Sequence, residues 1–240
     1  MTIAPGRWQA DVYDALSAML ASTPSGALAT FDWDNTCMTG DIGEAVLEDL
    51  DAADQGGRLH AYEDMCVERG KHVAYAWCAF QIAQRSEPDV TRFAERTFKA
   101  RLADGRMRVR PEIVDLIAAM HAAGWDVWVV SASEERLVKA LAPHYGIAPE
   151  RVIGMRLATA NGLLQPHLDG PNTFRQGKVD AIDQRIGRRP TFAAGDAETD
   201  LEMLGSAKHR LFLDKRGQAD DPTRVAVEAM GALVQSAVAW

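Results

Sequence analysis

The sequence contains few cysteines, and their positions exclude two kinds of stabilised scaffold. Its 240 residues include Cys37, Cys66 and Cys78, and none of these forms the closely spaced pairs typical of a structural zinc site. An odd number of cysteines at uneven spacing also argues against the disulfide framework of a small secreted domain. We therefore expect reduced thiols and a cytoplasmic protein.

Long apolar runs and basic clusters are missing as well. No stretch approaches the ~20 apolar residues that span a bilayer. The first residues, MTIAPGRWQADVYD, have neither the basic start nor the apolar core of a signal peptide. The formal net charge is −8, and the basic residues are scattered rather than gathered in a stripe. The composition thus argues against membranes and nucleic acid as main partners.

What the sequence does contain is an alternation of helical and strand patterns. A helix over residues 8–20 precedes a short apolar strand over 27–31, and helices and strands alternate from residue 110 onward. Residues 157–170 fit a hairpin or an irregular excursion, with Asn161-Gly162 as the turn. The alternation predicts an α/β fold, a doubly wound Rossmann-like parallel sheet with helices on both faces. The later strands are expected at residues 125–130, 151–155, 191–194 and 210–213, and the later helices at 111–122, 134–144, 177–186, 198–204 and 223–239.

About ninety residues separate the first strand from the second, far more than such connections usually need. We expect an inserted helical domain over residues 41–105 and an α/β core formed by residues 1–40 and 106–240. Gly40 and Gly105 lie at the junctions, and glycine tolerates the backbone rotations that a hinge requires. The helices of the insert are expected at residues 42–50, 62–84 and 90–102.

Polar residues follow several of the expected strands. Asp32 and Asp34 come directly after the first, Ser131 after the second, and Asp196 after a later one. In a parallel sheet these carboxyl ends meet at one edge, where ligands bind. Each residue alone has an ordinary explanation, since aspartates occur in turns and Ser131 with Glu134 fits a helix-capping box. Two adjacent carboxylates, however, need a cation or a proton between them when they are desolvated.

Four segments together resemble the ordered motifs of the haloacid dehalogenase superfamily of phosphohydrolases. They are FDWDNT at residues 31–36, VVSAS at 129–133, Gly177-Lys178, and GDAETDLEML at 195–204. The pairing of D-x-D-x-T with G-D-x-x-x-D is specific, and the motifs span most of the chain. The expected insert is similar to the small helical cap of the phosphoserine phosphatase branch, which also includes phosphorylcholine phosphatases.

The resemblance implies a role for each motif residue in phosphate-ester hydrolysis. Asp32 resembles the nucleophile that forms an aspartyl-phosphate. Asp34 resembles the general acid that protonates the leaving alcohol and later activates water. Ser131, with Ala132 beside it, and Lys178 would bind the phosphoryl oxygens.

The resemblance also implies Mg²⁺, a hard cation that prefers oxygen ligands. It assigns the metal to the Asp32 carboxylate, the Asp34 backbone carbonyl and Asp196. Asp200 belongs to the same set and would orient either Lys178 or a metal-bound water.

These residues favour a Mg²⁺-dependent phosphatase that acts on a small-molecule phosphomonoester, as a monomer or a homodimer. A haloalkanoate dehalogenase needs neither the metal nor a second acid, so Asp34, Asp196 and Asp200 argue against it. A non-catalytic phosphate-binding protein would be expected to lose Asp32 or Asp34. A phosphomutase stays open as an alternative, because it forms the same aspartyl-phosphate and differs in how its cap excludes water.

The insert offers groups that favour an amine-bearing substrate. Asp41 and Glu44 lie where the chain enters it, and in the phosphoserine phosphatase branch an acidic residue of this region contacts the substrate ammonium. Aromatic faces also attract cations, by ~0.5–2 kcal/mol per contact. We therefore expect phosphoserine, phosphoethanolamine or phosphocholine, with a sugar phosphate as the alternative, although the same aromatics could simply pack the insert. They are Tyr62, Tyr75, Trp77 and Phe80.

Overall fold

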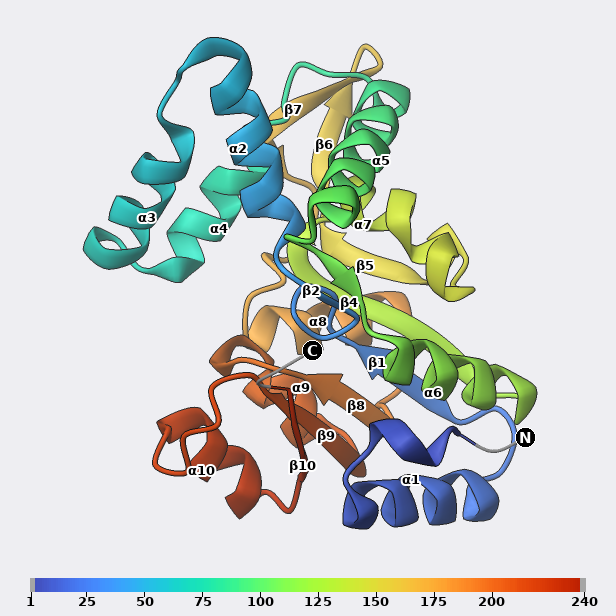
Figure 1. The fold of residues 1–240 in the computed structure, drawn as a ribbon. Helices are drawn as coiled ribbons and strands as arrows, with labels where there is room; N and C mark the ends of the chain where they lie inside the picture. Colours follow the sequence, from blue (N-terminus) through green and yellow to red (C-terminus); the bar gives the residue numbers. More distant parts are fainter. Residues whose placement is uncertain (1–2, 238–240) are drawn as a thin grey trace.

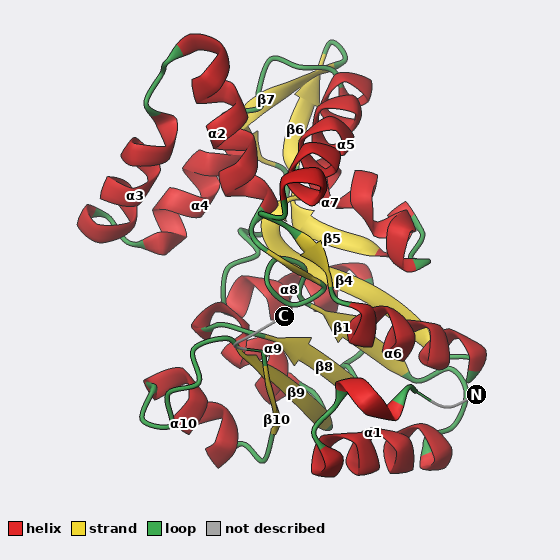
Figure 2. Cartoon of the chain, viewed as in Figure 1, coloured by secondary structure: helices red, strands yellow, loops and turns green. Residues whose placement is uncertain are grey.

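Six parallel strands form the central sheet of the protein (Figures 1 and 2). In chain order they are β1 (Leu28–Phe31), β4 (Asp126–Glu134), β5 (Val152–Met155), β8 (Phe192–Gly195), β9 (His209–Asp214) and β10 (Leu233–Ser236). The computed structural model describes residues 3–237, and the order across the sheet is β10-β9-β8-β1-β4-β5. Every neighbouring pair is parallel, which confirms the predicted α/β fold.

Helices cover both faces of the sheet. One face carries α1 (Ala10–Ser22), α6 (Pro111–Ala122) and α7 (Glu135–Leu141), and the other carries α8 (Gln176–Arg185), α9 (Leu201–Ser206) and α10 (Pro222–Ala229). Ala29 and Phe31 of β1 pack with the first group, whereas Leu28 packs with the second. Both faces of β1 are therefore buried, as its apolar sequence predicts. Within residues 3–237, no helix has the length and apolar composition needed to cross a membrane.

Four helices between β1 and β4 form an insert, residues 41–105. They are α2 (Ile42–Asp54), α3 (Arg58–Glu68), α4 (Lys71–Phe80) and α5 (Glu87–Asp104). Figure 1 shows α3 on the far side of the insert from the sheet, whereas α4 contacts β4 and α5 packs against α7 of the core. The chain enters and leaves the insert through two short antiparallel strands, β2 (Met38–Thr39) and β3 (Arg108–Val109). Gly40 and Gly105 flank this pair in left-handed conformations, with φ of 89° and 78°.

A small hairpin joins the insert to the core at a second place. β6 (Leu157–Ala160) and β7 (Leu163–Leu168) pair around Asn161 and Gly162, whose φ values of 52° and 77° suit a two-residue turn. This confirms the hairpin predicted from the Asn-Gly pair. Leu164 then exchanges backbone hydrogen bonds with Gln84 and Arg85, at N···O distances of 2.8 and 2.9 Å.

Two expected helices differ from the structure. The helix expected over residues 62–84 is split at Gly70, which adopts φ 84° between α3 and α4. The helix expected over 223–239 ends at Ala229, and Gly231 (φ 72°) turns the chain into β10. β10 keeps the apolar residues that follow Gly231 in contact with the core by pairing with β9. Residues 238 and 239 of that expected helix lie outside the described residues.

The strand expected to end at residue 130 continues to Glu134. The capping box of Ser131 with Glu134 does not form, because Glu134 itself caps α7 by accepting the N–H groups of Arg136 and Leu137 at 2.7 and 3.2 Å. Alternation along the extended strand places Ser131 and Ser133 on one side of it. The sheet edge therefore presents two hydroxyl groups.

The packing of β5 against the start of α7 leads to a stability prediction. A Cβ atom at Gly154 would lie 2.7 Å from Glu135 Cα and 2.8 Å from the Ser133 backbone oxygen. We expect Gly154→Ala to lower the free energy of unfolding by ~1–3 kcal/mol through overpacking. Urea unfolding would measure this, with Gly205→Ala in α9 as the control. The nearest atom to that new Cβ is Met230 Sδ at 3.9 Å. Equal stabilities of the two variants would contradict the prediction.

Candidate active site

The carboxyl ends of three adjacent strands bring the motif residues together. Phe31 of β1 lies opposite Val129 of β4 and Ala194 of β8. The residues just beyond these ends are therefore neighbours in space although they are far apart in the sequence. The sheet register thus places Asp32 close to Asp196.

A buried lysine joins two of the carboxylates. The Lys178 ammonium lies 2.6 Å from Asp32 Oδ1 and 2.6 Å from Asp200 Oδ1, and its side chain is completely buried. Burial alone would lower the pKa of Lys178, but the carboxylates of Asp200 and Asp32 outweigh it and raise the pKa. Lys178 is therefore charged, and it fixes the orientation of Asp32.

Gly177 makes this position of Lys178 possible. A Cβ atom at residue 177 would lie 1.7 Å from the backbone oxygen of Asn172. Because only glycine fits, the first turn of α8 can lie directly against the preceding loop. Thr173 ties the same loop to β4 through a 2.6 Å hydrogen bond from its hydroxyl to the Ser131 carbonyl. The Gly-Lys pair of the sequence is thus a packing requirement as well as a source of charge.

The carboxyl of Asp34 differs in environment from that of Asp32. Burial raises the pKa of Asp32 to about 6, with Lys178 opposing the rise. Burial also raises the pKa of Asp34 well above its usual range, and the negative charges of Asp41 and Asp32 reinforce the effect. The Ser133 hydroxyl donates to Asp34 at 2.7 Å. A carboxyl with a raised pKa beside a lysine-paired Asp32 suits an acid next to a nucleophile.

Asp196 completes a group of three carboxylates. One of its oxygens, one of Asp32 and one of Asp200 all lie within 4.8 Å of one another. The Thr36 hydroxyl lies 3.1 Å from Asp32 Oδ2 and 3.0 Å from Asp196 Oδ1, so it holds these two side chains together. On its other side, Asp196 Oδ2 lies 2.7 Å from the Lys215 ammonium. A set of hard oxygen donors of this kind fits Mg²⁺.

Asp200 differs from the other two because both of its oxygens are engaged inside the protein. Oδ1 pairs with Lys178, and Oδ2 accepts the backbone N–H groups of Asp196 and Ala197 at 3.1 Å each. The geometry therefore favours a positioning role of Asp200 toward Lys178 over direct metal binding. Asp32 and Asp196 both face the adjoining cavity and are the carboxylates that fit a metal.

These groups form one end of a cavity between the sheet edge and the insert, which is partly open to solvent. Ser131 and Lys178 are completely buried and contact the site from behind its lining. Glu44 is exposed on the first turn of α2 and lines a separate groove with Arg101 and Arg106. Asp200 is also completely buried. The five remaining predicted site residues line the cavity: Asp32, Asp34, Asp41, Ala132 and Asp196.

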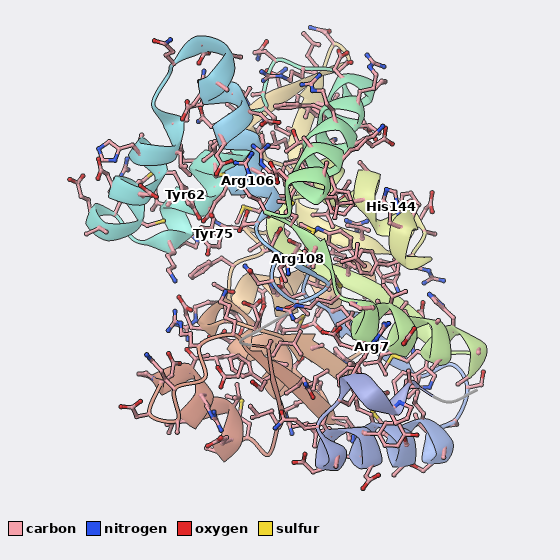
Figure 3. The ribbon with its side chains drawn as sticks, in the orientation of Figure 1. Arg7, Tyr62, Tyr75, Arg106, Arg108 and His144 are labelled. Carbon is pink, nitrogen blue, oxygen red and sulfur yellow. The ribbon has the colours of Figure 1, made fainter. Side chains whose placement is uncertain are left out.

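Two tyrosines form part of the opposite wall. Tyr62 of α3 and Tyr75 of α4 both line the cavity, and their rings are stacked with centroids 6.1 Å apart (Figure 3). Phe174 of the core meets the Tyr75 ring edge to face at 5.6 Å. Trp77 and Phe80 instead pack among apolar residues. Of the four aromatics noted in the sequence, Tyr62 and Tyr75 thus face the site.

Polar contacts also join α4 to the core beside the cavity. Lys71 forms an ion pair with Glu198, which lies between Asp196 and Asp200 in the chain. The Asn172 side chain donates to the His72 backbone oxygen at 3.0 Å. The insert therefore touches the loops that carry the carboxylates and the loop that precedes Lys178.

Sequence reasoning missed the placement of three residues: Thr36, Ser133 and Lys215. Thr36 was expected only as part of the first motif. It lies four residues after Asp32, and its hydroxyl contacts the Asp32 carboxylate. Ser133 follows from continued alternation in β4. Lys215 directly follows the end of β9, so the strand-end rule that located Asp196 also applied to it.

Comparison with known proteins identifies the family. The model of the haloacid dehalogenase-like hydrolases matches residues 29–205, well over half of the chain. The protein therefore belongs to the haloacid dehalogenase-like hydrolase family, as the motifs predict.

Two relatives of known name are phosphatases. Phosphorylcholine phosphatase of Pseudomonas aeruginosa is 27% identical over 277 aligned positions, covering 86% of this chain and 79% of the relative. Phosphoserine phosphatase of Halobacterium salinarum is 30% identical over 139 positions, covering 56% of this chain and 65% of the relative.

Solved structures support the fold. A protein of unknown function from Anaerococcus prevotii matches with a TM-score of 0.75 at 18% identity, covering 90% of this chain and 88% of its own. A phosphoserine phosphohydrolase-like protein from Francisella tularensis matches with a TM-score of 0.60 at 17% identity, covering 88% of this chain and 94% of its own.

The buried ion pair leads to a pH-dependent stability prediction. We expect Lys178→Met to lower the free energy of unfolding near pH 7 by ~3–5 kcal/mol, because two buried carboxylates lose their counter-charge. Without Lys178 the folded-state pKa values of Asp32 and Asp200 rise further above their unfolded values. Stability is then retained at low pH, where both groups are protonated in either state, and is lost as the pH rises through the folded-state values.

Urea unfolding of the wild type and the variant at pH 5 and pH 7.5 would measure this difference. Lys208→Met removes an exposed lysine before β9 and serves as the charge-matched control. A loss of the same size at both pH values would contradict the account of the ion pair.

Proposed function

We propose that the protein is a Mg²⁺-dependent phosphatase that hydrolyses a small phosphomonoester through phosphorylated Asp32. The observation that carries this proposal is the arrangement of Asp32, held by the buried Lys178, beside Asp34, whose carboxyl lies 2.7 Å from the Ser133 hydroxyl, at one end of a cavity. The phosphatase relatives support the same class of reaction.

The residues suit a reaction in two displacements. A carboxylate oxygen of Asp32 attacks phosphorus while the bond to the ester oxygen breaks, and Asp34 gives its proton to the leaving alcohol. Asp34, now a carboxylate, then takes a proton from water, which attacks the phosphorus and releases phosphate and Asp32. Lys178 keeps Asp32 aligned through both steps and offsets negative charge at the site.

The carboxylates of Asp32 and Asp196 would hold the Mg²⁺, together with the Asp34 backbone carbonyl by the family pattern. When bound, the ion neutralises charge on the phosphoryl group that would otherwise repel a carboxylate nucleophile. Thr36 keeps the two carboxylates together, and Asp200 keeps Lys178 in place.

We assign the insert, residues 41–105, the role of a cap over the site. Gly40 and Gly105 lie where its two connections meet the helices, and the contact of Lys71 with Glu198 lies on the side facing the core. A cavity enclosed in this way favours a small substrate over a protein.

The cavity wall favours a substrate head group that is cationic and carries no carboxylate. Asp41 and the rings of Tyr62 and Tyr75 offer a negative charge and π faces to an ammonium group. Among the described lining residues the one cationic side chain is Lys215, whereas five are acidic: Asp32, Asp34, Asp41, Glu134 and Asp196. A substrate carboxylate would instead meet Asp41. Phosphocholine and phosphoethanolamine therefore fit better than phosphoserine, and better than a sugar phosphate.

The reaction class can be tested by phosphate release from p-nitrophenyl phosphate. We expect turnover in Mg²⁺, its loss in EDTA and its return when Mg²⁺ is added again. Asp32→Asn should lower the rate roughly a thousandfold or more, because the amide is not a nucleophile. Asp14→Asn, an exposed position on α1, is the control. Full activity in EDTA or in Asp32→Asn would exclude the mechanism, and transfer to a second alcohol without free phosphate would indicate a phosphomutase.

The head-group preference can be tested with phosphocholine, phosphoethanolamine, phosphoserine and glycerol phosphate. We expect the first two to have the highest kcat/KM, and Asp41→Asn to lower it for them by roughly tenfold while glycerol phosphate changes little. Asparagine still caps α2, so the helix is retained. Glu44→Gln, three residues on but outside the cavity, is the matched control. If Asp41→Asn lowers kcat/KM for glycerol phosphate as much as it does for phosphocholine, Asp41 does not recognise the ammonium group.

A further inference from the structure

Lys215 stands out because it pairs with a carboxylate that the proposed metal would need. Its ammonium lies 2.7 Å from Asp196 Oδ2, and Asp196 is almost completely buried. Lys215 follows the end of β9, next to β8, whose end carries Asp196. The two residues therefore meet because their strands are neighbours in the sheet.

The backbone that carries Lys215 is held firmly in place. The carboxylate of Asp214 accepts the N–H groups of Arg216 and Gly217 at 3.1 and 2.9 Å and pairs with Arg224 at 2.9 Å. The Asp214 carbonyl accepts the N–H of Ala237 at 2.8 Å. These bonds fix the start of the Lys215 side chain beside the site and leave its flexible stem to set where the ammonium lies.

Lys215 differs from Lys178 in its freedom to move. Lys178 is completely buried and is bound by two carboxylates, whereas the Lys215 side chain is 36% exposed and lines the cavity. A cation bound at either oxygen of Asp196 would face the Lys215 ammonium across a single carboxylate and would repel it. The adjoining cavity gives the ammonium a place to go.

We propose that Lys215 is a tethered counter-cation of the metal site, which neutralises Asp196 in the metal-free protein and must be displaced before a divalent ion binds. The inference rests on the proposed metal site. It has two consequences that oppose each other: Lys215 stabilises the metal-free fold, and it weakens metal affinity. Once displaced, its ammonium stays within the cavity that its side chain lines.

Direct metal titration tests the proposal without any turnover. Mn²⁺ binding, followed by the electron paramagnetic resonance signal of the free ion, would be compared among wild type, Lys215→Met, Lys215→Arg and the control Lys208→Met. We expect Lys215→Met to bind Mn²⁺ roughly tenfold more tightly, because the competing charge is gone. Lys215→Arg and Lys208→Met should stay near wild type.

Melting temperatures of the same proteins give the second readout. Without metal, Lys215→Met should melt below wild type, and saturating Mg²⁺ should raise its melting temperature by more than it raises that of wild type. Without metal, Lys215→Arg should melt near the wild-type temperature, because arginine keeps the positive charge. If only the packing of the lysine side chain mattered, arginine would not restore the melting temperature.

The outcomes separate this inference from the proposed function. If wild type binds Mn²⁺ but Lys215→Met binds it with unchanged or weaker affinity, the role of Lys215 is overturned and the proposed function is not. No divalent binding by wild type at millimolar concentration would overturn both the role and the proposed metal dependence. Acetylation of lysines in the wild type, measured by mass spectrometry, adds a check that needs no variant. Mg²⁺ should increase labelling of Lys215 relative to Lys208, and unchanged labelling would also overturn displacement.

Discussion

The ion pair of Lys178 with Asp32 and Asp200 is the interaction on which the rest of the site depends. A carboxylate shielded from water is either protonated or a cost to stability unless a counter-charge lies beside it. Lys178 supplies that charge from a completely buried position. α8 can place it there because Gly177 has no side chain to clash with the preceding loop. Asp200 in turn holds Lys178 and is itself fixed by two backbone N–H groups. The orientation of Asp32 is thus set by three separate elements of the core.

The two ends of the cavity are built in different ways. The carboxylates lie at strand ends, and their relative positions follow from the register of a parallel sheet. The opposing wall comes from α2, α3 and α4 of the insert, which is joined to the core through two short strands, the packing of α5 against α7 and contacts with the hairpin and loops. Changes in the wall, for example at Tyr62 or Tyr75, can therefore alter which head group fits without disturbing the charge balance around Lys178.

Sequence patterns predicted the layers of the fold and most residues of the candidate site, because strand ends and motif spacing are local features. They did not predict the split at Gly70 or the pairing of β10 with β9, where a glycine and tertiary packing override a helical pattern. Lys215 was missed for a related reason. A single lysine carries no pattern of its own, and its partner Asp196 becomes visible only when the order of β8 and β9 is known.

The paired strands β2 and β3 have a consequence for how the insert can move. Two connections that were separate and flexible would let the insert tumble, whereas hydrogen-bonded strands resist sliding and twisting against each other. Gly40 and Gly105 lie just beyond the pair and tolerate the backbone rotations that bending requires. For the cap that we propose, bending about this pair would return the same side chains to the same places. The linkage itself would then set how the cavity wall aligns with the carboxylates.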